Sequence, residues 1–413
     1  MKIGLIGLGK LGLPVALSIE NRGHDVMGYD INPQVAEYIK NRRIPYQEEG
    51  TPELLEKTNL RLGTLEEVVK FSEIIFVPIQ TPHHEKYEGT TRLPDERVDF
   101  NYSYLVRGMA DISRVVDEIG ESRIVVIIST VLPGTVEREI KPVTSKKIRL
   151  CYNPFFIAMG TTRADFEKPE FVLLGCDDGE TQLIVEDFYS TIHKQPVFKT
   201  SIKNAELIKV IYNTFISTKI AFINTVMEVC DKMGCNVDIV SDAIALGTDR
   251  LISTKYLRGG MGDAGGCHPR DNIALSWLAR EKELSFDWFE NIMIAREKQT
   301  EWLAKLIKSV KDQFDMEVII LGEAYKKNIN LTIGSSSTLL SNLLTEIGVE
   351  HSTFDPFTTP VPFSAGKLRP AIYFVATNHD VFKDYEFEPG TVVIDPWNII
   401  KDQDQVIVRR VGR

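Results

Sequence analysis

The sequence predicts an α/β protein with two Rossmann-like, doubly wound domains joined by a long central helix and a helical middle region. Three observations carry this prediction. In residues 1–199, apolar runs of strand length alternate with segments of helical period, a pattern typical of a parallel sheet with helices on both faces. Residues 204–234 have the pattern of one long helix, and the β/α alternation resumes in the last third of the chain. We therefore expect domains at 1–200, 201–312 and 313–413.

The predicted strands of the first domain include five apolar runs. Each is a short, largely apolar run followed by a segment of helical period, and strands of this kind are buried on both faces of a sheet. The runs lie at residues 3–6, 25–29, 74–78, 124–128 and 171–174.

The predicted central helix has apolar side chains nearly all round. They are Leu207, Ile208, Ile211, Phe215, Ile220, Phe222, Ile223, Val226 and Met227. Such a helix is buried in its own fold or against a partner subunit, and the second alternative favours an oligomer. The elements predicted after it are helices at 237–246, 271 to about 311 and 336–347, and strands at 318–321, 372–375 and 392–394.

Composition excludes several classes of protein. The 413 residues include 48 Lys and Arg against 58 Asp and Glu, a net charge of −10, whereas a nonspecific grip on nucleic acid needs a basic surface. No apolar stretch approaches the length of a membrane span, and no signal peptide is recognised. Five scattered cysteines argue against a disulfide framework. We expect a soluble cytoplasmic protein that binds neither nucleic acid nor membrane.

A glycine-rich turn follows the first predicted strand. Gly7 permits a tight turn, Gly9 lets the backbone approach a pyrophosphate, and Gly12 lets helix and strand pack closely. Asp30 ends the second predicted strand, where a carboxylate accepts bonds from the adenosine ribose and repels a 2′-phosphate. The pattern predicts NAD as the cofactor, and the alternative is a plain turn with Asp30 as a helix cap.

A second glycine-rich segment, residues 259–266, leads into Cys267. A thiol beside Arg270 and just ahead of a predicted helix N-terminus is more easily ionised, and hence more nucleophilic. The alternative is a free cysteine in a flexible loop. A metal site is not predicted, because Cys267 and His268 lack a second spaced pair of ligands.

Two further groups of polar residues fit a site. Lys209 and Asn213 lie four residues apart, so they share one face of the central helix; the alternative is a satisfied bond between helices. Ser129 and Thr130 follow the strand at 124–128, at the edge of a parallel sheet where ligands bind. The alternative for Ser129 and Thr130 is that they begin a helix and have no role in a site.

In this order, the glycine turn, Ser129-Thr130, the Lys209/Asn213 pair and the Gly-Gly-Cys-His-Pro-Arg-Asp loop resemble the UDP-glucose/GDP-mannose dehydrogenase family. The resemblance covers nearly the whole chain. It extends to Gln80-Thr81-Pro82, to Leu321-Gly322-Glu323-Ala324-Tyr325-Lys326 and to Gly412-Arg413.

The resemblance implies an enzyme of polysaccharide biosynthesis that oxidises the C6 alcohol of a nucleotide sugar twice, with two NAD used per acid formed. It also implies a homodimer that forms through the helical middle region. By this resemblance Cys267 attacks the aldehyde, and a thioester is left for water. Lys209 stabilises oxyanion charge with help from Asn213, Asp271 supports the base chemistry and Thr130 orients a water. The implied substrate-binding residues are Lys209, Asn213, Tyr256, Gly262 and Lys326, and the implied cofactor-binding residues are Gly7, Gly9, Lys10, Leu11, Gly12, Asp30, Thr81, Thr130 and Arg270.

The chain departs from the family at residues 153–160. The family usually has Asn-Pro-Glu-Phe-Leu-Arg-Glu-Gly there, and this chain has Asn-Pro-Phe-Phe-Ile-Ala-Met-Gly. The glutamate linked to thioester hydrolysis falls on Phe155, which cannot accept a proton. An Arg-Glu pair expected in the last domain falls on Ile333 and Gly334, and a lysine of the cysteine loop is Arg270.

These departures leave three functions open. The first is oxidation of a UDP-glucose-like sugar to the uronic acid, with another group in place of the lost base. The second is an altered outcome, in which the enzyme stops at the aldehyde or passes the thioester to a nucleophile other than water. The third is a catalytically weak nucleotide-sugar-binding homologue.

Overall fold

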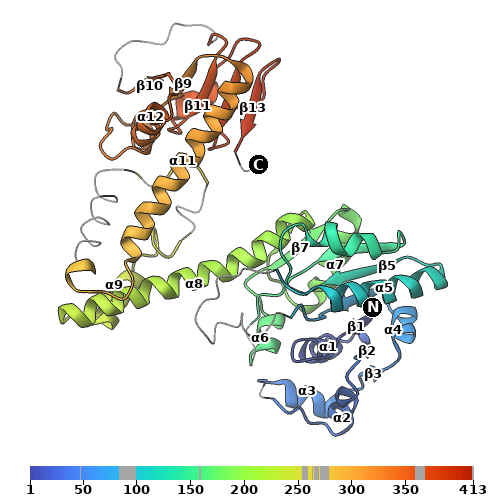
Figure 1. Cartoon of the computed structure of the whole chain (residues 1–413). Coiled ribbons are helices and arrows are strands. Elements are labelled where there is room, and N and C mark those ends of the chain that lie inside the picture. Colours follow the sequence, from blue (N-terminus) through green and yellow to red (C-terminus); the bar gives the residue numbers. More distant parts are fainter. Residues whose placement is uncertain are drawn as a thin grey trace. The chain divides into compact units, whose positions relative to one another are not determined.

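The structure, a computed structural model, describes residues 1–46, 48–82, 99–157, 160–253, 259–262, 264, 269, 279–358 and 368–411. The chain divides into two compact units, Met1–Thr218 and Lys219–Arg413 (Figure 1). No helix within the described ranges is long and apolar enough to cross a membrane.

The first unit is built on one eight-stranded sheet of order β3-β2-β1-β4-β5-β6-β7-β8. Its strands are β1 (Lys2–Ile6), β2 (Asp25–Tyr29), β3 (Arg61–Leu62), β4 (Ile74–Val77), β5 (Arg123–Ile127), β6 (Ile148–Tyr152), β7 (Val172–Cys176) and β8 (Val197–Thr200). Every neighbouring pair is parallel except β6 and β7. The order reverses at β1, so the carboxyl ends of β1 and β4 form a switch point where ligands bind in folds of this kind.

Helices cover both faces of this sheet. The buried side chains form two hydrophobic clusters, one on each face of the sheet. On one face, α1 and α7 pack against Ile3 and Leu5. On the other, α4 and α5 pack against Ile75 and Val77. The helices of this unit are α1 (Gly12–Asn21), α2 (Gln34–Lys40), α3 (Thr51–Lys57), α4 (Leu65–Phe71), α5 (Ser103–Ile119), α6 (Thr162–Glu167) and α7 (Gly179–Ile192), with short helical turns at Val136–Ile140 and Lys141–Val143.

Helix α8 (Ile202–Met233) runs from the first unit into the second, where α9 (Val237–Ala245) and α11 (Trp288–Phe314) follow. The second unit has a five-stranded parallel sheet of order β10-β9-β11-β12-β13. Its remaining elements are β9 (Val318–Leu321), α12 (Ser336–Glu346), β10 (His351–Phe354), β11 (Ile372–Val375), a helical turn at Asp380–Asp384, β12 (Val392–Asp395) and β13 (Ile407–Arg410). Helices α11 and α12 bury one face of this sheet.

The predicted fold class is confirmed, with one helix placed wrongly. The region expected to be helical from residue 271 to about 311 is interrupted: Glu283 has a positive φ of 50°, and α11 begins only at Trp288. There Asp287 caps the helix by accepting the backbone N–H of Glu290 at 2.9 Å. A left-handed residue cannot continue an α-helix, so the chain turns before α11.

Candidate functional site

The glycine turn after β1 has the strained geometry that glycine permits. Gly7 has φ 111°, and its N–H donates to the Tyr29 carbonyl at 2.8 Å. A Cβ on Gly12 would lie 2.0 Å from the Gly7 carbonyl oxygen and 3.0 Å from a Pro78 side-chain carbon. Glycine is therefore required at both positions, and the turn holds β1, α1 and the end of β4 together.

The first turn of α1 offers donors for an anion. No side chain among the described residues caps this helix at Leu11, and Gly9 and Lys10 are exposed. A Cβ on Gly9 would meet nothing within 4 Å, so the space in front of the turn is open. Free N–H groups and the helix dipole favour a phosphate at this point.

Asp30 joins the end of β2 to the same turn. One carboxylate oxygen accepts the Leu8 N–H at 2.6 Å, and the other accepts the Asn32 N–H at 2.7 Å. A carboxylate has about four acceptor positions, so capacity remains for ribose hydroxyls. The turn and Asp30 together fit a dinucleotide, with the pyrophosphate at α1 and the ribose at Asp30.

Thr81 and Thr130 meet at the carboxyl edge of the sheet. The Thr81 hydroxyl donates to the Thr130 carbonyl at 2.7 Å, and the Ser129 hydroxyl donates to the Ile79 carbonyl. Glu206 on α8 fixes the loop beyond: its buried carboxylate accepts the N–H groups of Gly134 at 2.5 Å and Val136 at 2.8 Å. The sequence alone did not predict the role of Glu206, because the two residues that donate to it lie about 70 positions away in the chain.

Lys209 is buried, with only 8% of its surface exposed. Its ammonium donates to the Phe155 carbonyl at 2.7 Å and lies 5.0 Å from the centre of the Phe156 ring. Burial lowers the pKa of Lys209. The Phe155 ring packs on Phe166, with ring centres 5.6 Å apart. The backbone at residue 155, rather than a side chain there, therefore holds the ammonium.

The remaining predicted residues lie elsewhere or outside the described part of the chain. Asn213, one helical turn beyond Lys209, is exposed. Gly262 and Lys326 lie in the second unit, where a Cβ on Gly262 would be 3.2 Å from Cγ of Arg296. Cys267, Asp271, Arg270 and Tyr256 lie outside the described residues.

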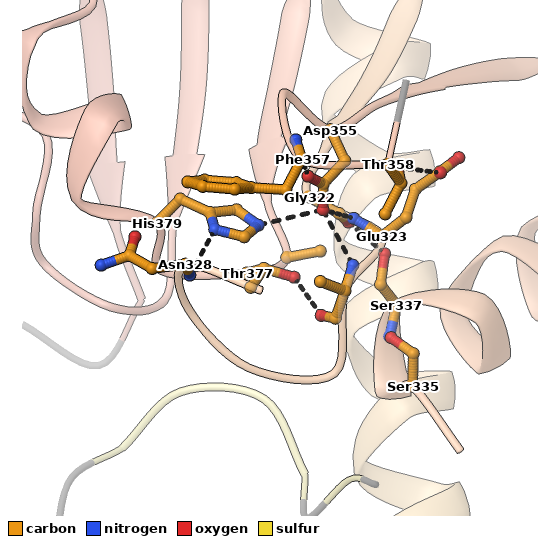
Figure 2. A network of polar contacts seen from close by, with 12 residues as sticks. Gly322, Glu323, Asn328, Ser335, Ser337, Asp355, Phe357, Thr358, Thr377 and His379 are labelled. Atoms are coloured by element: carbon orange, nitrogen blue, oxygen red, sulfur yellow. Dashed lines mark hydrogen bonds and ion pairs between the residues drawn. The ribbon is translucent and has the colours of Figure 1, made fainter. Parts of the chain in front are cut away.

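The second unit contains a buried polar network that the sequence did not reveal (Figure 2). Asp355 follows β10 and His379 follows β11, and neither has any exposed surface. His379 Nε2 lies 2.9 Å from Asp355 Oδ2, which also accepts the N–H groups of Glu323 at 2.7 Å and Ala324 at 2.8 Å. The sequence offered one sign of this network, because Asp355 directly follows a strand, as Asp30 does.

Residues 1–193 match the NAD binding domain of the UDP-glucose/GDP-mannose dehydrogenase family, and residues 203–297 match the central domain of that family. The chain belongs to the UDP-glucose/GDP-mannose dehydrogenase family. The resemblance drawn from the motifs is thereby confirmed, and so is NAD as the cofactor.

Relatives within this family are distant in sequence. A UDP-glucose 6-dehydrogenase of Bacillus subtilis is 27% identical, over 99% of this chain and 86% of that protein. A GDP-mannose 6-dehydrogenase of Pseudomonas savastanoi is 26% identical, over 86% of this chain and 81% of that protein. The crystal structure of a GDP-mannose dehydrogenase from Pseudomonas aeruginosa has the same fold, with a TM-score of 0.87 at 22% identity over 99% of both chains.

Proposed function

We propose that this chain is an NAD-dependent nucleotide-sugar 6-dehydrogenase. It oxidises the C6 alcohol of a UDP-glucose-like sugar towards the uronic acid, through a thiohemiacetal and then a thioester on Cys267. The observation that carries the proposal is Lys209, a buried ammonium held 2.7 Å from the Phe155 carbonyl on a helix that leaves the NAD binding domain. Bound NAD supplies the chemistry of hydride acceptance.

The residues of the chain supply charge and position. A fixed ammonium close to a developing oxyanion lowers the barrier to its formation, which is the role proposed for Lys209 with help from Asn213. Cys267 is the nucleophile, Asp271 supports the base chemistry and Thr130 orients a water.

Binding is assigned to the other predicted residues. Gly7, Gly9, Lys10, Leu11, Gly12 and Asp30 hold NAD, together with Thr81, Thr130 and Arg270. Tyr256, Gly262 and Lys326 bind the nucleotide sugar.

A second outcome is favoured by Phe155. Its ring packs on Phe166 within the core, and a phenyl ring cannot take a proton from water. Without the glutamate that the family carries there, the thioester on Cys267 persists until another nucleophile accepts the acyl group, or the reaction stops at the aldehyde.

We also propose that the enzyme is a homodimer that pairs through α8. Apolar side chains along this helix are exposed in the single chain: Leu207, Ile211, Phe215, Ile216, Phe222, Met227 and Met233. Exposed apolar surface of this extent marks an interface. Light scattering after size exclusion should give twice the chain mass, and Ile211→Glu should reduce it to the mass of one chain.

The deciding experiment counts NADH per sugar. The enzyme is given excess NAD and a panel of UDP- and GDP-sugars, and the intact protein mass is measured afterwards. Two NADH per sugar, a free uronic acid and unmodified protein support the full oxidation. A single burst with a sugar adduct on Cys267, or one NADH per sugar, supports the second outcome.

Two variants test the nucleophile. Cys267→Ala should form no acid, whereas Cys235→Ala, at an exposed cysteine in the second unit, should behave as wild type. Unchanged activity in Cys267→Ala would contradict the covalent route and favour a simpler hydroxy-acid type of dehydrogenase. No NADH with any sugar would overturn the proposal and favour a binding protein.

A further inference from the structure

The Asp355–His379 pair holds both ends of one turn in the second unit. This turn, residues 323–328, follows β9 and contains Lys326. At its start, Asp355 accepts the N–H groups of Glu323 and Ala324. At its end, His379 Nδ1 accepts the Asn328 N–H at 2.8 Å (Figure 2).

The bonding pattern assigns the tautomer of His379. Nδ1 receives a hydrogen bond from Asn328 and so carries no proton, and Nε2 therefore donates its proton to the Asp355 carboxylate. Aromatic neighbours fix the imidazole. The Phe357 ring stacks on it, with ring centres 4.7 Å apart, and the Phe382 ring packs against it in a T-shaped arrangement, with ring centres 5.2 Å apart. A neutral, fully buried ring thus connects the carboxylate to the backbone of the turn.

Asn328 is held by more than its backbone. It has a positive φ of 60°, which asparagine tolerates better than most residues. Its side-chain amide donates to Asp380 at 2.6 Å and accepts the Asp380 N–H at 3.1 Å. Lys327 lies 3.5 Å from the same carboxylate, while the Lys326 ammonium lies over the Tyr325 ring, 5.7 Å from its centre.

The position of the turn is that of a ligand site. Strand β9 lies between β10 and β11. From β9 the chain adds β10 on one side and then continues with β11 on the other, so the strand order reverses between β9 and β11. In parallel sheets, ligands bind at the carboxyl ends of the strands at such a point. Asp355 itself has little capacity for a ligand, because the Phe357 N–H, at 2.8 Å, joins its three other donors. Recognition here therefore falls to the turn and its lysines.

We propose that His379 is a positioning residue: with Asp355 it fixes the 323–328 turn so that Lys326 meets the phosphate groups of the nucleotide sugar. The inference rests on the proposed function, which supplies the diphosphate ligand. A lysine on a fixed turn binds a phosphate better than one on a mobile turn, since less conformational entropy is lost on binding.

The test compares three variants of the full-length protein. His379→Leu removes both hydrogen bonds, and His379→Gln offers an amide oxygen to Asn328 and an amide N–H to Asp355. His351→Gln is the matched control, because His351 begins β10 and bonds to Ser341 and Val349 instead. For each, we would measure calorimetric binding of UDP and GDP, hydrogen exchange across the turn, and steady-state kinetics.

His379→Leu should speed exchange at the Asn328 amide, raise the Kd for the nucleoside diphosphate and the KM for the sugar about tenfold, and leave the KM for NAD unchanged. His379→Gln should restore most of the affinity, and His351→Gln should match wild type. Wild-type affinity in a folded His379→Leu protein would overturn the inference. A comparable loss of NAD binding would do so too, because it would indicate a general structural defect.

A measurement on the unaltered chain covers the case in which His379→Leu does not fold. UDP or GDP should slow exchange in the 323–328 turn of the wild-type protein, and failure of both to change it would overturn the inference. If the nucleotide protects the turn but no sugar yields NADH, the proposed function fails alone. If NADH forms while nucleotides leave the turn unprotected, this inference fails alone.

Discussion

The backbone N–H of Leu8 donates to the Asp30 carboxylate across 2.6 Å, which ties the end of β2 to the turn after β1. The second unit repeats this relation, since the N–H of Glu323 donates to Asp355 across 2.7 Å. The two carboxylates differ in what else they bind. Asp30 keeps acceptor capacity for a ribose, whereas further bonds from Ala324, Phe357 and His379 take up that of Asp355.

Asp30 should decide between NAD and NADP. Asp30→Asn keeps one oxygen for the Leu8 N–H and removes the charge that repels a 2′-phosphate. We expect the preference for NAD over NADP, as a ratio of kcat/KM values, to fall about tenfold, or about 1.4 kcal/mol. The control is Asp25→Asn, at an exposed ion pair with Arg61, which should leave the ratio unchanged. An unaltered ratio in Asp30→Asn would place cofactor selection elsewhere.

Two alanine substitutions should separate folding from cofactor binding. A Cβ at Gly9 meets nothing within 4 Å, so Gly9→Ala should keep the wild-type Tm while the Kd for NAD rises about tenfold. A Cβ at Gly12 would collide with the Gly7 carbonyl at 2.0 Å, so Gly12→Ala should also lower the free energy of unfolding by about 1–3 kcal/mol. Thermal melts and calorimetric titration with NAD measure both effects. Equal Tm losses in the two variants would refute this distinction.

The sequence predicted those parts of the fold that depend on neighbouring residues alone. Strands β1, β2 and β9 are apolar runs between turn signals, and the glycine turn with Asp30 has a fixed spacing. The antiparallel pairing of β6 with β7 was not predictable in this way, because strand direction depends on where the intervening chain packs.

The site was predictable only where side-chain type reveals the role. Lys209 stands out as a polar residue on an apolar helix, but its partner is the carbonyl of Phe155, and any residue offers a carbonyl. His379 and Asp355 lie 24 positions apart in the chain. They meet because they follow two parallel strands of the same sheet, β11 and β10. Such pairs are set by the fold, and no spacing rule finds them.

Glu206 should stabilise the first unit through its two backbone donors. The residue is 1% exposed, and it accepts the N–H groups of Gly134 and Val136. Glu206→Gln leaves one amide N–H facing another donor, so we expect the free energy of unfolding to fall by about 1–3 kcal/mol. Glu137→Gln, which breaks an exposed ion pair with Lys141, should cost less than about 1 kcal/mol. Urea unfolding followed by circular dichroism compares them, and similar losses would show that burial of Glu206 is not decisive.

Asp355 should make the second unit sensitive to acid. Burial alone would raise the pKa of this carboxyl, but hydrogen bonds from His379 and from the N–H groups of Ala324, Phe357 and Glu323 outweigh it, so the pKa lies below its usual value. A carboxyl of lowered pKa contributes stability above its unfolded pKa of about 3.9, and this contribution is lost as the pH falls below that value.

Asp355→Asn should remove that contribution. We expect the variant to be less stable than wild type by about 2–3 kcal/mol at pH 6, and the difference should shrink as the pH falls from 5 towards 3. All four tryptophans lie in residues 277–397, so their fluorescence during urea unfolding reports on the second unit. Asp312→Asn, at an exposed pair with Lys308 on α11, should show neither effect. If the stability difference between Asp355→Asn and wild type stayed constant with pH, the Asp355 carboxyl would not be the titrating group, because only a group charged in one protein and absent from the other makes that difference depend on pH.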